Sequence, residues 1–133
     1  MTADETAVLA ANDSFYRAFA ARDLPALDRL WAQRAEVVCI HPGWQALRGR
    51  EAVMNSWKDI LGNPGAPAIA CVRATAYVLG EAAFVVCSER LPAAELVATN
   101  IFTREEGEWR MVQHHAGGVA VPTSEAEPSG TVH

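Results

Sequence analysis

Hydrophobic positions in the first sixty residues repeat with the period of an α-helix. Between Asp4 and Arg22 they recur at Val8, Ala11, Phe15, Ala18 and Phe19, which predicts an amphipathic helix. Asp23 is a suitable cap for a second, shorter helix, with Pro25 in its first turn. A third helix is predicted over residues 49–62, where Val53, Trp57, Ile60 and Leu61 fall on one side.

The remaining hydrophobic segments have the composition of β-strands. AEVVCIH, residues 35–41, predicts a strand between the second and third helices, and residues 63–67, NPGAP, predict a loop. Four β-rich segments joined by short turns follow, at residues 68–79, 82–91, 95–104 and 108–117. Consecutive strands with tight turns form an antiparallel meander. We therefore expect an α+β protein in the order α-α-β-α-β-β-β-β, with three helices packed on a curved antiparallel sheet and a pocket at its open end.

The length of 133 residues fits one domain with a substantial core. We expect this domain to cover residues 1–118. Residues 119–133 are rich in Pro, Ser, Thr and Glu, a composition that predicts a flexible C-terminal tail.

Charge and cysteine usage exclude several classes of function. The formal net charge is −5 and the arginines are scattered singly, so no basic surface for nucleic acid is expected. No segment has the roughly 20 apolar residues of a membrane span, and the N-terminus has no signal-peptide pattern. Cys39, Cys71 and Cys87 lie in apolar strand-like segments without CxxC spacing, which indicates reduced, buried thiols and a cytoplasmic protein.

Strand periodicity selects the first candidate site residues. Cys39 and His41 share one face of their strand because side chains alternate between faces. His41 stands at the strand end and titrates near neutrality, so it is a candidate acid or base. Trp44 follows the Pro-Gly turn, where its indole could cover the rim of a pocket.

The last hairpin has two possible registers. A two-residue turn at Glu106-Gly107 would pair Asn100 with Gln113 and place it on the face of His115. A three-residue loop at 105–107, favoured by Gly at its third position, pairs Asn100 with Val112. We choose the second register, which gives one inward surface and turns His115 to the opposite face. That surface consists of Leu96, Ala98, Asn100, Phe102, Val112 and His114.

Three stretches carry a resemblance to a known family: FYRAFAARDLPALDRLW, VVCIHPGWQALRGREAVMNSW and EGEWRMVQHHAG. In this order they resemble the nuclear transport factor 2-like superfamily, and in particular its SnoaL-like branch. The resemblance implies a cystatin-like cone and a homodimer formed through the outer face of the sheet. The superfamily hosts isomerases, cyclases, dehydratases, transport adaptors and kinase association domains, so it implies no single activity.

The resemblance to ketosteroid isomerase can be tested residue by residue. It places Phe15 at the position of the isomerase tyrosine, with Tyr16 next to it. Cys39 falls at the position of the aspartate base and Asn100 at that of the protonated acid. The missing base argues against steroid isomerisation. Cyclase members use an acidic residue, and we find none at the matching strand positions.

Together these observations predict a pocket for a small apolar or aromatic molecule. The candidate catalytic residues are His41 and His114, as proton carriers, and Asn100, as a group that polarises a carbonyl. The candidate ligand-binding residues are Cys39, Trp44, Tyr16, Phe15, Phe102 and Val112. No metal or cofactor is expected, because adjacent strand residues such as His114 and His115 face opposite ways.

Two classes of function fit the pocket. One is acid/base chemistry on a small carbonyl compound by an isomerase, dehydratase or cyclase. The other is a non-catalytic ligand-binding or homo-oligomeric assembly module, as in the kinase association domains of the superfamily. The residues leave open whether the protein is an enzyme.

Overall fold

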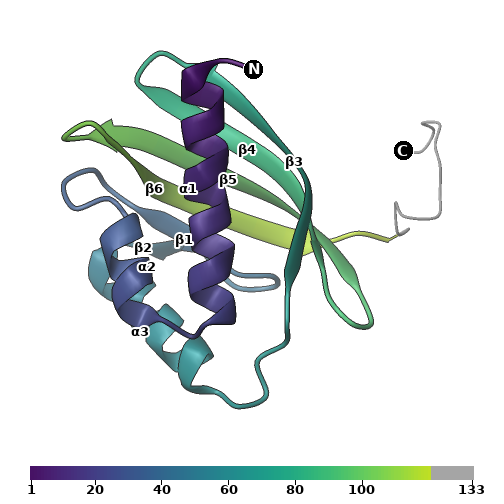
Figure 1. The fold of residues 1–133 in the computed structure, drawn as a ribbon. Helices are drawn as coiled ribbons and strands as arrows, with labels where there is room; N and C mark the ends of the chain where they lie inside the picture. Colours follow the sequence, from purple (N-terminus) through teal and green to yellow (C-terminus); the bar gives the residue numbers. More distant parts are fainter. Residues whose placement is uncertain (121–133) are drawn as a thin grey trace.

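The computed structural model describes residues 1–120 of the chain and confirms the α+β fold. Its elements, in order, are α1 (Ala3–Ala20), α2 (Leu24–Leu30), β1 (Val38–Ile40), β2 (Leu47–Arg48), α3 (Arg50–Gly62), β3 (Ala70–Leu79), β4 (Ala82–Arg90), β5 (Glu95–Glu105) and β6 (Glu108–Gly118). Figure 1 shows α1 lying along the inner face of a curved sheet, with α2 and α3 beside it. Apart from residues 119 and 120, the tail predicted for residues 119–133 lies outside the described residues.

The six strands form one sheet in the order β2-β1-β6-β5-β4-β3. The meander from β3 to β6 is antiparallel, as predicted. At the other edge, β1 pairs with β6 in parallel and β2 pairs with β1 in antiparallel orientation. The sheet is therefore mixed, rather than antiparallel throughout as expected from the sequence. Strand β2 was not predicted, because two residues are too few to show a period.

Capping explains where the first two helices begin. The Thr2 hydroxyl accepts a hydrogen bond from the Glu5 amide, and the Glu5 carboxylate accepts one from the Thr2 amide, which forms a capping box. The Asp23 carboxylate accepts from the Ala26 amide at 3.1 Å, which confirms Asp23 as the cap of α2.

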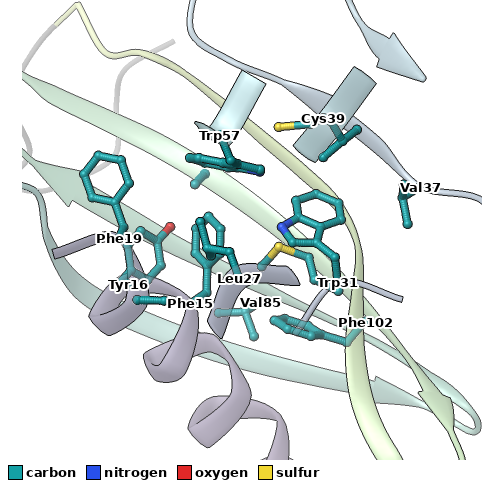
Figure 2. Packing of buried hydrophobic residues seen from close by; sticks show 14 of the residues in the cluster. Phe15, Tyr16, Phe19, Leu27, Trp31, Val37, Cys39, Trp57, Val85 and Phe102 are labelled. Atoms are coloured by element: carbon teal, nitrogen blue, oxygen red, sulfur yellow. The ribbon is translucent and has the colours of Figure 1, made fainter. Parts of the chain in front are cut away.

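The core lies between the helices and the inner face of the sheet. Figure 2 shows Phe15, Tyr16 and Phe19 projecting from α1 toward Trp57. Trp31, Trp57 and Trp109 are buried, whereas Trp44 is 49% exposed. No helix within residues 1–120 is both long enough and apolar enough to cross a membrane.

The hairpin between β5 and β6 corrects one prediction. Glu105 pairs with Glu108, so the turn has two residues and the predicted three-residue loop is wrong. Glu106 and Gly107 have φ values of 53° and 78°, the two positive values that this turn type requires. The register then shifts between Ile101 and Phe102, so that Asn100 pairs with His114. Asn100 and His114 therefore share the inner face, as predicted. The β-bulge adds one residue to β6, which returns His114 to the face from which a two-residue turn alone would have removed it.

Candidate functional site

A cavity of about 320 Å³ opens between α1, α3 and the inner face of the sheet. Its apolar wall is largely aromatic, with Phe15, Phe19, Trp44 and Trp57 among the lining residues. Five polar or titratable side chains also line it: Tyr16, His41, Asn63, Glu89 and His114. This combination of apolar wall and a few converging polar groups is typical of small-molecule sites.

The sequence-predicted residues divide into two sets. The cavity is lined by His41, His114, Trp44, Tyr16 and Phe15. The lining does not include Cys39, Asn100, Phe102 or Val112. Cys39 lies behind His41, with its Sγ 3.6 Å from the His41 Nε2. Phe102 is fully buried core, and Val112 is partly buried against that core.

Glu89 is the pocket acid that the sequence analysis missed. Its side chain follows Ala83, Val85 and Cys87 on the inward face of β4 and is 2% exposed. The Tyr16 hydroxyl donates to its Oε2 at 2.6 Å, and the same oxygen lies 3.8 Å from the His114 Nε2. The alternation in AAFVVCSER contained the signal, since it places a carboxyl on the apolar face of a strand.

Asn100 orients His114. The Asn100 Nδ2 donates to the Asn12 Oδ1 at 2.8 Å and to the Tyr16 hydroxyl at 3.2 Å. Its Oδ1 therefore faces the His114 Nδ1 at 2.6 Å and accepts a hydrogen bond from it. This arrangement fixes the proton of His114 on Nδ1 and leaves a lone pair on Nε2, the nitrogen that faces Glu89.

Ser56 orients His41 in a similar way. The Ser56 hydroxyl donates to the Val53 carbonyl at 2.7 Å, so it accepts from the His41 Nε2 at 2.9 Å. The His41 proton then resides on Nε2 and its Nδ1 carries the lone pair. Ser56 and Asn12 both lie on helices, where sequence alone gave no reason to connect them with histidines on strands.

Burial sets the protonation of these groups. It lowers the pKa of His41 to about 4 and, together with the nearby His41 and His115, lowers the pKa of His114 to about 3. Burial raises the pKa of Glu89, a shift partly opposed by the hydrogen bond from Tyr16. Both imidazoles are neutral at physiological pH, and the Glu89 carboxyl is moved toward the range where a carboxylic acid donates a proton.

The other polar groups are less suited to reaction. Burial, followed by the charge of Glu89, raises the pKa of the Cys39 thiol to about 12, so this thiol is a poor nucleophile. Burial also raises the pKa of Tyr16, as does its proximity to Glu89. Within residues 1–120, no three side chains of His, Cys, Asp or Glu lie close enough together to hold a metal ion.

The wall that closes the cavity at the end of α3 is a loop held by an arginine. The Arg22 guanidinium donates to the carbonyls of Leu61 and Asn63 at 2.7 and 2.9 Å. Asn63, Gly65 and Ala66 contribute to the lining. Arg22 thus fixes one wall of the cavity from outside.

Comparison with known proteins agrees with the resemblance read from the sequence. The family model described as a SnoaL-like domain matches residues 8–122. A "putative dehydratase" of the nuclear transport factor 2-like family from Streptomyces avermitilis is 32% identical, with a TM-score of 0.81, over 89% of this chain and 97% of that one. A "putative calcium/calmodulin-dependent protein kinase type II association domain" from Thiobacillus denitrificans is 33% identical, with a TM-score of 0.73, over 83% of this chain and 93% of that one.

A plant protein also matches. The F-box protein SKIP8 of Arabidopsis thaliana is 27% identical over 112 residues, which are 83% of this chain and 48% of that protein. The chain thus spans about half the length of this curated relative. The match to the family model and the close structural relatives identify the chain as a member of the SnoaL-like family, with the nuclear transport factor 2-like fold.

Proposed function

We propose that the cavity catalyses the elimination of water from a small β-hydroxy carbonyl compound. The observation that carries this proposal is the pair formed by the His114 Nε2 and the Glu89 Oε2, 3.8 Å apart at the cavity wall. The imidazole presents a lone pair, and the carboxyl has a raised pKa. Such a pair supplies the base and the acid that an elimination requires.

The proposed reaction uses each group once. The His114 Nε2 takes the proton on the carbon next to the carbonyl, and the electrons of that C–H bond form the new C=C bond. The C–O bond to the hydroxyl breaks, and the hydroxyl leaves as water with the proton of the Glu89 carboxyl. The imidazolium and carboxylate that result are neighbours, so transfer of one proton from His114 to Glu89 restores the starting state.

The other polar residues hold this pair in place. Tyr16 donates to Glu89 and Asn100 accepts from His114. The amide hydrogens of Asn100 already bond to Asn12 and Tyr16, and its side chain is fully buried. We therefore propose that Asn100 is a positioning residue rather than the group that polarises the carbonyl. His41, with its lone pair on Nδ1, accepts a hydrogen bond from the substrate.

The relatives support elimination over other acid/base reactions. Isomerisation and cyclisation could use the same pair, but the Streptomyces avermitilis relative, at 32% identity, is named a "putative dehydratase". The reaction uses only protein side chains. The positions of the three cysteines, which are free thiols, support a cytoplasmic location.

A second candidate function is assembly. It is favoured by the 33% identity to an association domain and by exposed apolar residues on the outer side of the sheet, namely Tyr77 and Val97. We propose that this outer face forms a homodimer. The variant Val97→Glu should convert the dimer to a monomer in light scattering, while a wild-type protein that is already monomeric at micromolar concentration would contradict the proposal.

The dehydratase proposal is tested by replacing the acid. A set of β-hydroxy ketones in D₂O, followed by NMR, reports both loss of the hydroxyl and exchange of the adjacent hydrogen. Glu89→Gln should lower the rate of water loss by about 10² to 10⁴-fold, as is usual for removal of a general acid. The matched control is Glu108→Gln, which changes an exposed carboxylate outside the cavity. Full activity in the Glu89→Gln variant would show that Glu89 is not the acid.

A further inference from the structure

We propose that the cavity selects an uncharged molecule with a single ring and excludes anions, including carboxylates, phosphates and coenzyme A esters. This inference names the substrate class of the proposed dehydratase site and rests on that proposal for its location. It follows from the charges, the free donors and the size of the cavity.

The first step concerns positive charge. Among residues 1–120, the lining of the cavity contains one carboxyl group and no Lys or Arg. The arginines next to its walls are directed at other groups. Arg22 donates to backbone carbonyls, and Arg90, beside Glu89 in the chain, approaches the Glu95 carboxylate at 4.0 Å. An anion in the cavity would therefore lose its water without gaining a cation, which is strongly unfavourable.

The second step concerns hydrogen-bond donors. An anionic group needs N–H or O–H donors to replace water. The one proton of His114 is donated to Asn100 and the one proton of His41 to Ser56. The Tyr16 hydroxyl donates to Glu89. Apart from the side-chain amide of Asn63 and the indole of Trp44, which also line the cavity, the polar side chains offer one carboxylic acid as donor and two imidazole lone pairs as acceptors. These uncharged groups match a carbonyl or hydroxyl better than a carboxylate.

The third step concerns cations. An ammonium group would find the lone pairs and the aromatic wall favourable. To form an ion pair, however, it would have to ionise the Glu89 carboxyl against the burial that raises its pKa. It would also have to lose its own water shell. An uncharged ligand has neither penalty, and it leaves Glu89 protonated, as the elimination requires.

The size and wall of the cavity define the rest of the ligand. A volume of about 320 Å³ is at the lower end of the roughly 300–1,000 Å³ found for ligand pockets. Phe15, Phe19, Trp44 and Trp57 provide ring faces and edges around that space. Aromatic side chains pack favourably with planar rings, so one ring with a short polar substituent fits.

The experiment compares three unreactive probes of nearly equal size, each added to the wild-type protein at neutral pH. The probes are acetophenone, benzoate and benzylammonium, and binding is followed by the indole N–H signal of Trp57 in two-dimensional NMR. Acetophenone should bind, with benzoate at least about tenfold weaker. Equal or tighter binding of benzoate or benzylammonium, or no binding of acetophenone up to its solubility limit, would overturn the inference.

A charge-placement variant provides the matched control. Ile60 lines the cavity from α3, whereas Ala52 on the same helix is exposed and lies outside the lining. Ile60→Arg should increase benzoate binding by about tenfold relative to acetophenone, while Ala52→Arg should leave the ratio unchanged. If Ile60→Arg does not fold, the wild-type comparison still decides. None of the probes reacts, so this experiment tests binding alone. If acetophenone binds selectively but no β-hydroxy ketone loses water, the ligand class stands and the dehydratase proposal fails.

Discussion

Glu89 and Glu105 are two glutamates on neighbouring strands whose surroundings differ in kind. Glu89 is enclosed by side chains, with the Tyr16 hydroxyl donating to its Oε2. Glu105 instead accepts hydrogen bonds from the backbone amides of Gln33, Arg34 and Ala35 at 2.8, 3.0 and 2.9 Å. The first carboxyl lies 3.8 Å from the His114 Nε2, and the second ties the segment after α2 to the end of β5.

Their protonation follows from this difference. Burial raises the pKa of Glu89. For Glu105 burial is the largest single effect and raises the pKa, but its three backbone hydrogen bonds and the charge of Arg110 together outweigh it and lower the pKa. A carboxylate that accepts several N–H bonds is stabilised in its charged form, and one buried among side chains is not. The same residue type thus serves as a structural anion at one end of the sheet, while at the other its surroundings favour the protonated carboxyl that we propose as the acid.

The largest effect on stability is expected from removing the Asn100 side-chain amide, which holds Tyr16 and His114 next to Glu89. Asn100→Leu removes the hydrogen-bond partner of the buried Asn12 Oδ1 and of the His114 Nδ1, while Tyr16 loses a donor. The free energy of unfolding should fall by about 3 kcal/mol, measured by urea denaturation. A decrease of less than about 1 kcal/mol would mean that water replaces the amide in this network.

A smaller effect is expected from pH. His41 and His114 have pKa values of about 4 and about 3 in the folded protein, and 6.5 is the ordinary value. Between these values the unfolded chain binds protons that the folded protein does not, so stability is full above pH 6.5 and is lost as the pH falls. Within this range each histidine lowers the free energy of unfolding by at most about 1.4 kcal/mol per pH unit, measured by urea denaturation at several pH values.

Glu89 acts in the opposite direction over the same pH range. Its raised pKa means that the folded protein holds a proton that the unfolded chain has released, so its contribution to stability decreases as the pH rises above 4.5. Glu89→Gln should therefore steepen the loss of stability on acidification. An unchanged or shallower slope in this variant would show that the Glu89 carboxyl is not protonated in the folded protein.

The smallest effect is expected at the other glutamate. Glu105→Gln replaces a charged acceptor of three backbone hydrogen bonds with a neutral amide and should lower the free energy of unfolding by about 1 kcal/mol. Glu89→Gln should leave that quantity unchanged or raise it at neutral pH, since a buried carboxyl is replaced by an uncharged group of equal size. The free energies of unfolding of the two variants can be compared by urea denaturation at neutral pH. A lower value for Glu89→Gln than for Glu105→Gln would contradict the expected order.

The sequence predicts the fold well because its signals are local. Helix periodicity, the Asp23 cap and strand composition each depend on a few neighbouring residues. The site depends on contacts between distant segments, and these are predicted less completely. Alternation identified His41 and His114 as cavity residues, and the same rule applied to β4 would have identified Glu89. Asn12 and Ser56 could not be connected with the histidines, because which residue faces a strand depends on how α1 and α3 pack.

The turn between β5 and β6 shows how a local rule can fail. Gly at the third loop position favoured a three-residue loop, but Glu106 adopts a positive φ, which is uncommon for a glutamate. A two-residue turn alone would have turned His114 away from Asn100. The bulge in β6 restores its direction, and no pattern in EWRMVQHHAG marks the residue at which this shift occurs.

The position of β6 in the sheet has a consequence for how the protein is made. It is the last strand within residues 1–120, yet it lies between β1 and β5, and its parallel pairing with β1 sets Cys39 opposite His114. During synthesis, the β1–β2 pair has no other neighbour in the sheet until the ribosome has released residues 108–118. One edge of β1 therefore stays unpaired while residues 49–107 are made. The His114 side of the cavity is in place only once β6 lies between β1 and β5.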